Sequence, residues 1–451
     1  MNETESAGEQ VLSYLENRQY HELRQYLENE EAADVAGWFL EIPREYFLLL
    51  FRILPKELAA EVFVQLEPDV QETLLRAFSD EELGQVVERL FVDDTVELIE
   101  EMPANVVHRI IANTTPEKRS AVNALLQYPR DSAGSGMTTE FVELKTQMTA
   151  ADVFKKIKRS GIDRETIYDC YVTDRSRRLI GVLSIKDLLI TKAENPTVGE
   201  LMQTEPISAN VLDSEEDVAR RLQKYGFLAM PIVDNENRLV GILTYDDAMH
   251  VLSENDSEDM EIMAAITPTD TTYLRTPVFA LWKARIPWLL ILMLSSTFTS
   301  RILQSFEDAL VSCAALTAFI PMLMGTGGNA GAQVSVTVIR GLSLGEIRMR
   351  DVFRILWKEW RVSLLCGLTL SIVNFGKMLL IDRVTIPVAI TVSLTVLAVV
   401  VIAKLVGGLM PVLAKRLGFD PAVMANPFIT TIVDILSLLL YFFIAGRILG
   451  I

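Results

Sequence analysis

The feature that most constrains this chain is a carboxylate inside an apolar segment. Residues 428–443 read Phe-Ile-Thr-Thr-Ile-Val-Asp-Ile-Leu-Ser-Leu-Leu-Leu-Tyr-Phe-Phe, with Asp434 near the middle. An ionised Asp at the centre of a membrane-spanning helix costs about 2.5–3.5 kcal/mol even on the lenient insertion scale, so it is tolerated mainly where it faces a water-filled path or binds a cation. Asp434 therefore indicates ion transport. A structural Asp that pairs with Lys404 is the alternative.

Charge divides the chain into two unlike parts. From Arg275 onward there are 16 Lys and Arg against 8 Asp and Glu, which leaves residues 1–274 with 26 cations and 52 anions. The acidic part is long enough for two domains, and its field repels nucleic acid and attracts cations. The alternative is that this charge only maintains solubility. Cys170, Cys313 and Cys366 are scattered, which fits a reducing cytosol and gives no zinc pattern.

Five apolar stretches in the second part approach the roughly 20 residues that a spanning helix needs. They are residues 286–305, 309–339, 362–380, 386–413 and 423–446. If residue 274 is cytosolic, the inner loops hold most of the Lys and Arg, as the positive-inside rule requires. The inner cations are Lys283, Arg285, Arg340, Arg348, Arg350, Arg354, Lys358, Arg361, Lys415 and Arg416. An odd number of spans places the C-terminus outside, and a start without a signal-like segment keeps the acidic part in the cytosol.

The second stretch is rich in glycine. It contains Gly325-Thr-Gly-Gly-Asn-Ala-Gly331 after Pro321, and we expect these residues to loosen the helix. Irregular backbone at membrane depth is tolerated where it lines water or is buried in protein, so carbonyls and the amides of Asn329 and Gln333 are expected to face a cavity. The alternative is that the glycines only let helices pack closely.

The fifth stretch is mostly apolar but carries one polar stripe. Thr430, Thr431, Asp434 and Ser437 lie at spacings of three and four, which places them on one face of a helix. Carboxylate and hydroxyl groups suit a hard, hydrated cation.

An internal repeat lies in the acidic part. Residues 174–187 recur as residues 234–247, and both copies end in Gly, two apolar residues, Ser or Thr, two further residues and Asp. Each copy predicts two strands joined by a turn, preceded by a helix at residues 150–159 or 214–224. The pair resembles a tandem CBS domain, and this implies that the hydroxyl and carboxylate of the ending contact an adenosine nucleotide. The residues concerned are Ser184, Asp187, Thr244 and Asp247. Capping of the last helix is the alternative.

Residues 10–128 predict short helices in series, several of them starting at a Pro. Such a series implies a superhelical array. Asp93 and Glu97 share a face of one helix, where like charges repel; a solvated face is the default interpretation and a cation-accumulating face the functional one. The acidic segment that starts at Ser253 predicts a helix continuing to about Ile266, which connects sensor to pore.

The order of these parts is similar to that of MgtE-type bacterial magnesium channels and transporters, over essentially the whole chain. The resemblance implies an all-α superhelical domain at residues 1–130, an α/β tandem CBS pair at 131–250, a connecting plug helix at 251–280 and a five-helix α transmembrane domain at 281–451. It also implies a homodimer in the cytoplasmic (inner) membrane that conducts Mg²⁺ between its second and fifth spans. Mn²⁺ and Co²⁺ are the alternative ions.

The resemblance assigns roles to particular residues. Asp434 and its mate hold hydrated Mg²⁺, and Asp420 lies at the cytoplasmic mouth. The implied pore-lining residues are Gly325, Gly328, Asn329 and Thr431. Intracellular Mg²⁺ is implied to close the pore by bridging acids of the array, the CBS pair and the plug helix. The implied bridging residues are Asp93, Glu97, Asp247, Glu258 and Asp259.

The chain also departs from the family pattern. Glu97 stands where Asp is expected, and His250 and Asn255 stand where relatives can carry acids. Asp169 lies near the expected position of an aromatic residue that stacks on adenine, so ATP is a doubtful cofactor and we expect little effect of it on gating.

Elementary chemistry agrees with Mg²⁺ as the ion. Mg²⁺ sheds water reluctantly and is usually held by one or two carboxylates through its hydration shell, so one Asp doubled by symmetry suffices. An enzyme would need a catalytic constellation, but His21, His108 and His250 lie in no nucleophile or metal motif. An anion channel would need spans lined by cationic or amide side chains. A purely sensory membrane protein would show no ion flux.

Overall fold

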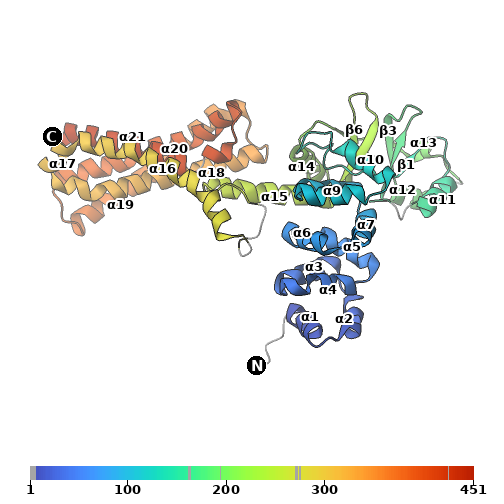
Figure 1. The fold of residues 1–451 in the computed structure, drawn as a ribbon. Helices are drawn as coiled ribbons and strands as arrows, with labels where there is room; N and C mark the ends of the chain where they lie inside the picture. The colour runs from blue at the N-terminus through green and yellow to red at the C-terminus, as the bar shows by residue number, and fades with distance from the viewer. Residues whose placement is uncertain are drawn as a thin grey trace. The chain divides into compact units, whose positions relative to one another are not determined.

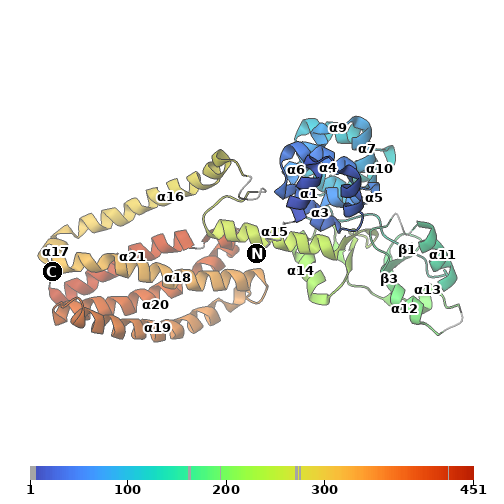
Figure 2. The same ribbon diagram turned by 90° about the horizontal axis from the view of Figure 1, so that it is seen from below.

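The computed structural model describes residues 7–160, 164–192, 195–269, 273, 276–424 and 426–450. These residues separate into two compact units, Met1–Asn255 and Asp256–Ile451, which are considered in turn (Figures 1 and 2). Residues 1–6, on which the prediction of no signal segment depends, lie outside the described residues, as does residue 274, which the predicted topology places in the cytosol.

The first unit begins with a series of short helices, as the sequence predicts. Pro68 and Pro116 occupy the first turn of their helices, where the missing N–H would have had no partner, and Pro55 and Pro103 immediately precede theirs. The helices are α1 (Ala7–Glu16), α2 (Tyr20–Leu27), α3 (Ala32–Glu41), α4 (Phe47–Ile53), α5 (Lys56–Val64), α6 (Pro68–Ala77), α7 (Asp80–Arg89), α8 (Val92–Glu101), α9 (Ala104–Ala112) and α10 (Pro116–Leu125), with a 3-10 turn at Arg44–Tyr46.

These helices stack along the chain. Each packs against a helix two places further on: α1 against α3, α3 against α5, α5 against α7, α7 against α9, and α8 against α10. Such repeated neighbour contacts produce a continuous apolar core under a solvated surface. The predicted superhelical array is therefore present, and it forms the blue column of Figure 1.

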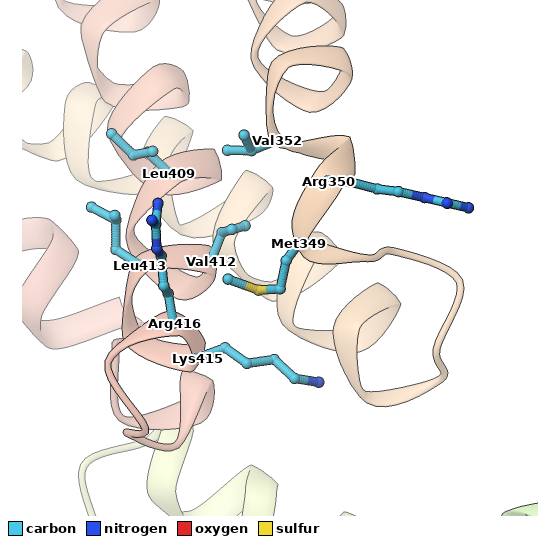
Figure 3. Close-up of a pocket in the computed structure, with 8 residues that line it drawn as sticks. All are labelled: Met349, Arg350, Val352, Leu409, Val412, Leu413, Lys415 and Arg416. Atoms are coloured by element: carbon cyan, nitrogen blue, oxygen red, sulfur yellow. The ribbon is translucent and has the colours of Figure 1, made fainter.

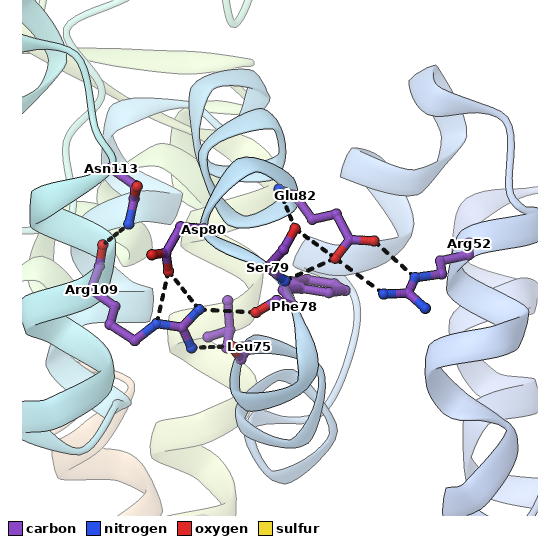
Figure 4. A network of polar contacts seen from close by, with 8 residues as sticks. All are labelled: Arg52, Leu75, Phe78, Ser79, Asp80, Glu82, Arg109 and Asn113. Carbon is purple, nitrogen blue, oxygen red and sulfur yellow. Dashed lines mark hydrogen bonds and ion pairs between the residues drawn. The ribbon is translucent and has the colours of Figure 1, made fainter.

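Two arginines connect neighbouring layers of this array (Figure 4). Arg52 of α4 donates to both carboxylate oxygens of Glu82 of α7, at 2.8 and 3.2 Å. Arg109 of α9 contacts the carboxylate of Asp80 at 2.9 Å and the carbonyl oxygen of Phe78 at 2.9 Å. The hydrogen bond from Arg52 lowers the pKa of Glu82 to about 2. The layers are thus joined by charged contacts at the surface and by the apolar core inside.

The repeat in the second part of this unit forms two small sheets. Their strand orders are β1-β2-β3-β4 and β5-β6-β7, and in each sheet the first pair is parallel and the second antiparallel. The strands are β1 (Glu143–Leu144), β2 (Asp169–Thr173), β3 (Leu179–Ser184), β4 (Gln203–Thr204), β5 (Ala209–Asn210), β6 (Ala229–Val233) and β7 (Leu239–Thr244). The helices between them are α11 (Ala150–Ser160), α12 (Ile185–Ile190), α13 (Val198–Leu201) and α14 (Glu215–Tyr225).

The two copies match in register as well as in order. Asp169 pairs with Ser184 in the first sheet, and Ala229 pairs with Thr244 sixty residues later. The turns of the copies also meet in a reciprocal pair of 2.9 Å backbone hydrogen bonds, from Leu179 N–H to the Asn237 carbonyl and from Leu239 N–H to the Arg177 carbonyl. Reciprocal contacts of this kind are expected of two copies related by an approximate twofold axis.

The helix that follows β7 is longer than predicted at its start. α15 (Tyr245–Met263) is continuous, because no Gly or Pro interrupts these residues. The predicted boundary between the CBS pair and the connecting helix, at residues 250–251, therefore falls inside one helix. The helix also ends three residues before the predicted Ile266, in a turn where Ala265 has a positive φ of 56°.

The second unit consists of long helices. They are α16 (Val278–Ser305), α17 (Glu307–Ser312), α18 (Ile320–Ser343), α19 (Val352–Leu380), α20 (Ile386–Arg416) and α21 (Asn426–Leu449), with 3-10 turns η3 (Ala314–Phe319), η4 (Met349–Asp351) and η5 (Pro421–Met424). α20 packs against α18, α19 and α21. Figure 2 shows α16 meeting this bundle near α17 and diverging from it at its other end.

Within the described residues, four helical stretches are long and apolar enough to cross a membrane. They are Val278–Ser305, Met349–Leu380, Ile386–Arg416 and Pro421–Leu449. α18 has 24 residues but is not among these four, because its glycines and amides make it less apolar. The predicted second stretch, 309–339, is also divided into α17, η3 and α18.

The glycine-rich helix is regular, which corrects the expectation that Pro321 and four glycines loosen it. α18 remains α-helical through Gly325–Gly331. Pro321 lies in the first turn, where it breaks no hydrogen bond. The backbone carbonyls of α18 are therefore used within the helix and do not turn toward a cavity.

Candidate metal centres

Asp434 is the carboxylate on which the ion-transport prediction depends. It is half-buried on α21, a helix that packs against α16, α18 and α20. Its Oδ1 is buried and has no hydrogen-bond partner among the described residues. A buried acceptor without a donor is costly, so the site is suited to a ligand that brings its own donors, such as the water shell of a cation.

The alternative partner, Lys404, does not neutralise Asp434 in the described structure. Lys404 is buried on α20, at 6% exposure. No carboxylate among the described residues lies within ion-pair distance of its ammonium, whereas Lys377 forms such a pair with Asp382 at 3.0 Å. The interpretation of Asp434 as one half of a structural ion pair is therefore not supported by these contacts.

The polar stripe of α21 lies against the glycines of α18. A Cβ placed on Gly328 would meet the side-chain methyl of Thr430 at 3.0 Å, and one on Gly327 would meet the Ser437 hydroxyl at 3.0 Å. The absence of side chains at these two positions lets the stripe approach the backbone of α18 closely. Thr431 turns its hydroxyl to its own helix and donates to the Pro427 carbonyl at 3.1 Å.

The glycine motif has two faces with different surroundings. Gly327 and Gly328 are buried in the helix contact, as the close-packing interpretation requires. Gly325 and Asn329 lie on an exposed face, and a Cβ on Gly325 would have nothing within 4 Å. Gln333 continues this exposed face one turn later. Both interpretations of the motif therefore apply, each to different residues.

Asp420 has a local structural contact. It follows α20, is exposed, and accepts a hydrogen bond from the Ala422 N–H at 2.7 Å, which fixes the start of η5 before α21. This contact leaves the carboxylate accessible to solvent.

In the first unit, acids from three segments converge on Asp247 of α15. Its charge raises the pKa of Asp93 and Glu97 on α8, of Glu165 before β2, and of Glu215 at the start of α14. We call these five residues the acidic cluster. The cluster brings together Asp93, Glu97 and Asp247, three of the five residues that were predicted to bridge Mg²⁺.

Burial is the largest cause of the raised pKa values in the acidic cluster, and repulsion by other members and by nearby carboxylates such as Asp94 and Asp246 adds to it. These effects raise the pKa of Glu165 to about 8, of Glu215 to about 7 and of Asp247 to about 6, and they raise the pKa of Asp93 well above its usual range. Asp93 Oδ1 and Glu165 Oε2 are also buried and have no hydrogen-bond partner in the described structure. In the described structure, the negative charge of the cluster is therefore not fully neutralised, and some of its oxygens accept no hydrogen bond.

His250 is a cation beside this cluster. Its Nε2 lies 3.1 Å from Glu254 Oε1 and 3.9 Å from Glu97 Oε1. The hydrogen bond to Glu254 raises the pKa of His250 to about 9, so the imidazole is charged at neutral pH. His250 therefore offsets part of the negative charge at the position where relatives were expected to carry an acid.

Sequence analysis did not find Glu140, Glu165 or Glu215. Glu140 accepts a hydrogen bond from the Val92 N–H at 2.9 Å and so connects the CBS pair to the start of α8. Glu165 lies in an irregular segment with no local motif. Glu140 ends the sequence Met137-Thr-Thr-Glu140, which recurs as Met202-Gln-Thr-Glu205, and such a repeat gives no sign of charge clustering.

Two predicted bridging residues lie elsewhere. Glu258 and Asp259 are on the later turns of α15 and belong to the second unit. No group of three or more His, Cys, Asp or Glu side chains in the described residues could hold a bare metal ion as they stand.

The predicted nucleotide contacts have local roles. The Ser184 hydroxyl caps α12 by accepting from the Lys186 N–H at 3.2 Å, and the Thr244 hydroxyl donates to the Asp247 carboxylate. Burial, and then the neighbouring Asp187, raise the pKa of Asp169. The Ser184 hydroxyl thus caps a helix, whereas the Thr244 hydroxyl contacts a side chain.

Comparisons with known proteins extend over nearly the whole chain. A family of divalent cation transporters matches residues 320–444, the MgtE intracellular N domain matches residues 30–131, and CBS domains match residues 135–193 and 198–254. The magnesium transporter MgtE of Thermus thermophilus is 37% identical over 431 residues, which is 95% of either chain. That of Bacillus subtilis is 32% identical over 435 residues, 96% of either chain.

Two solved structures match the acidic part. The cytosolic domain of the Mg²⁺ channel MgtE in complex with ATP aligns with a TM-score of 0.51 at 33% identity, covering 53% of this chain and 98% of that one. The soluble part of a magnesium transporter aligns with a TM-score of 0.52 at 26% identity, covering 56% of this chain and 99% of that one.

Proposed function

Because this chain belongs to the MgtE family of magnesium transporters, we propose that it admits Mg²⁺ across the cytoplasmic membrane along a path in which Asp434 is the selective group. Members of this family are transporters and not enzymes. The observation that carries the proposal is the buried Oδ1 of Asp434, which has no hydrogen-bond partner among the described residues.

The proposed selectivity depends on the water shell of the ion. Hydrated Mg²⁺ presents six waters whose hydrogens point outward, and a carboxylate accepts from them without displacing any. We propose that Thr431 and the Asn329 amide, which lies on the exposed face of α18, extend this polar lining. Monovalent cations gain less from the same carboxylate because their charge is half as large.

The proposed pore needs a second copy of the chain. Gly325, Asn329 and Gln333 form an exposed polar face on a helix that lies among apolar spans. We propose that a homodimer covers this face and that the two Asp434 carboxylates face one path. In this arrangement α18 is the fifth spanning helix, the N-terminal part is cytosolic, the C-terminus is outside, and the surrounding lipid belongs to the cytoplasmic membrane.

The proposed gate is the acidic cluster together with Glu258 and Asp259. Burial, and then repulsion by neighbouring carboxylates, raise the pKa values of Glu165, Glu215 and Asp93, so the folded state disfavours their charged forms. A divalent cation would relieve this repulsion, so intracellular Mg²⁺ would favour the packed arrangement, which we propose is the closed one. Loss of Mg²⁺ would restore the repulsion and favour the open arrangement.

Flux of the purified protein in liposomes tests the transport proposal. We expect uptake of Mg²⁺, with Mn²⁺ and Co²⁺ measured in the same preparation to define selectivity. Reversal potentials in opposed Mg²⁺ and Cl⁻ gradients should follow Mg²⁺. A reversal potential that follows Cl⁻ would identify an anion channel, and no flux of any ion would identify a sensory membrane protein.

Limited proteolysis around residues 253–263 tests the gate. Neutralising Glu258 and Asp259 removes ligands, so protection should need more Mg²⁺ than in the wild type. A bridging carboxylate contributes several kcal/mol of gross attraction at an effective dielectric near 20, whereas diffuse repulsion is screened within about 8 Å. Protection at lower Mg²⁺ in the neutralised protein would contradict bridging.

ATP binding to the CBS pair is a second candidate function. It is supported by the similarity to the cytosolic domain solved with ATP. Ser184 and Asp187 are available for ribose and phosphate, but the Asp169 carboxylate beside Asp187 places negative charge near the nucleotide. We therefore expect ATP to leave the Mg²⁺ midpoint of proteolytic protection nearly unchanged, and a shift that is lost in Asp187→Ala would establish a nucleotide site.

A further inference from the structure

A basic cavity lies at one end of the spanning helices, away from Asp434 and its polar stripe. It has a volume of about 470 Å³ and is lined by η4, the first residue of α19 and the last turns of α20. Figure 3 shows Met349 and Val352 on one side and Leu409, Val412 and Leu413 on the other. The remaining lining residues are Arg350, Lys415 and Arg416.

The three cations of this cavity have no acidic partner among the described residues. Arg350, Lys415 and Arg416 are exposed, and in the described part of the chain no carboxylate lies within ion-pair distance of them. The nearby Asp351 is paired with Arg354 instead, at 3.3 Å. Lys415 uses one N–H on the Leu342 carbonyl at 3.3 Å, which holds its ammonium at the cavity and leaves its other donors available.

The position of the cavity along the helices corresponds to a membrane surface. α20 has 31 residues and is therefore about 46 Å long, which exceeds the roughly 30 Å of the hydrocarbon core. Lys415 and Arg416 are in its last turn, so they lie at the level of the lipid headgroups. Trp357 and Trp360 of α19 stack on each other with ring centroids 5.0 Å apart, and both are exposed, as aromatic residues at a membrane interface usually are.

We infer that this cavity binds the headgroup of an anionic phospholipid. Arg and Lys donors suit the phosphate oxygens, and the apolar side chains of Leu409 and Leu413 suit the start of the acyl chains. A phospholipid fits better than free phosphate, because the cavity joins cationic and apolar walls.

Native mass spectrometry of the full chain tests this inference. The purified protein is exposed to equal amounts of phosphatidylglycerol and phosphatidylcholine, and retained lipid is counted. We expect the wild type to retain phosphatidylglycerol preferentially. Lys415→Gln should weaken this retention about fivefold, and each further cation removed, in Arg350→Gln and Arg416→Gln, by a similar factor. The charge-preserving triple variant R350K/K415R/R416K should retain the preference.

A matched control separates the cavity from general charge. Arg348→Gln, Arg354→Gln and Lys358→Gln together remove three cations from the same region without touching the cavity lining. We expect this variant to keep its preference for phosphatidylglycerol. An equal loss in the control would overturn the inference, because it would show attraction by the whole surface.

A second variant keeps the charge and fills the space. Met349→Trp adds bulk at a side chain that is already exposed, so we expect it to fold and to lose phosphatidylglycerol. If this variant retained as much phosphatidylglycerol as the wild type, the inferred lipid site would be wrong. The inference would also be overturned by displacement of the lipid by inorganic phosphate, which would identify an ion site, or by a changed oligomeric state in the triple Gln variant, which would identify the cavity as a contact with a second copy.

Discussion

At the level of single residues, the Glu165 carboxylate shows how burial and neighbouring charges disfavour ionisation in the acidic cluster. One of its oxygens is buried without a partner in the described structure, and burial together with Asp247 raises its pKa to about 8. In the unfolded chain the same group has a pKa near 4.3. At a pH between these two pKa values, Glu165 is protonated in the folded state and ionised in the unfolded state.

This difference predicts the pH dependence of stability. Because the folded state binds more protons, the free energy of unfolding should fall as pH rises from about 5 to about 8. Glu165→Gln should remove much of that fall and stabilise the protein by about 1 kcal/mol at pH 8.5. Amide hydrogen exchange of α8 at several pH values measures the free energy of unfolding in the wild type and in the variant.

The control for this experiment is Glu236→Gln, in an exposed turn, which should leave the pH dependence unchanged. Added Mg²⁺ should protect α8 more at pH 8.5 than at pH 5.5, since protonated carboxylates do not need a cation. Protection that is independent of pH would count against the acidic cluster as a cation site.

At the scale of helices, α18 depends on glycine for its contacts. A Cβ on Gly327 would meet Val399 and Val433 at 2.8 Å, which is closer than side chains tolerate without movement. Close approach of this kind is a common basis of helix association in membranes, where apolar burial between helices gives little driving force. The contact keeps the polar stripe of α21 against α18.

Substitution of Gly327 tests this packing. Gly327→Ala should force α18 away from α20 and α21 and destabilise the fold by about 1–3 kcal/mol, the usual cost of overpacking. Gly376→Ala on α19 is the matched control, because a Cβ there would have nothing within 4 Å and Ala is the better helix former. Thermal unfolding in detergent measures both. Equal stability of the two variants would refute the close contact.

At the scale of the whole molecule, the sequence predicted the order of the parts but not the composition of the sensing site. The helices α11 and α14 and the repeat with its sixty-residue shift follow from local periodicity, so they were predicted to within a residue or so. The acidic cluster depends on how α8 meets α14 and α15 in space. Local patterns contain no such information, so Glu165 and Glu215 were missed.

Contacts between the spanning helices could not be predicted from local sequence patterns either. Four of these helices are marked by apolar composition, but the regularity of α18 could not be predicted. Its glycines are compatible both with an irregular pore segment and with close packing, and only the positions of Thr430 and Val433 on the neighbouring helix decide that Gly327 and Gly328 are packing residues.

Closure of the whole channel by Mg²⁺ should depend on the acids of α8. The double variant Asp93→Asn with Glu97→Gln removes two members of the acidic cluster, so closure should need several-fold more internal Mg²⁺ while conduction persists. Glu100→Gln with Glu101→Gln removes the same charge from the same helix outside the cluster and should close as the wild type does. Patch-clamp recording with internal Mg²⁺ titrated measures both midpoints, and coincident midpoints would exclude α8 from the gate.

Mg²⁺ uptake by proteoliposomes tests whether Asp434 selects and conducts Mg²⁺. Asp434→Asn keeps the volume of the side chain and removes its charge, so uptake should fall at least tenfold while folding and oligomeric state are retained. Asp382→Asn makes the same chemical change at a residue paired with Lys377 between α19 and α20, and should transport as the wild type does. Undiminished Mg²⁺ uptake by Asp434→Asn would contradict the account.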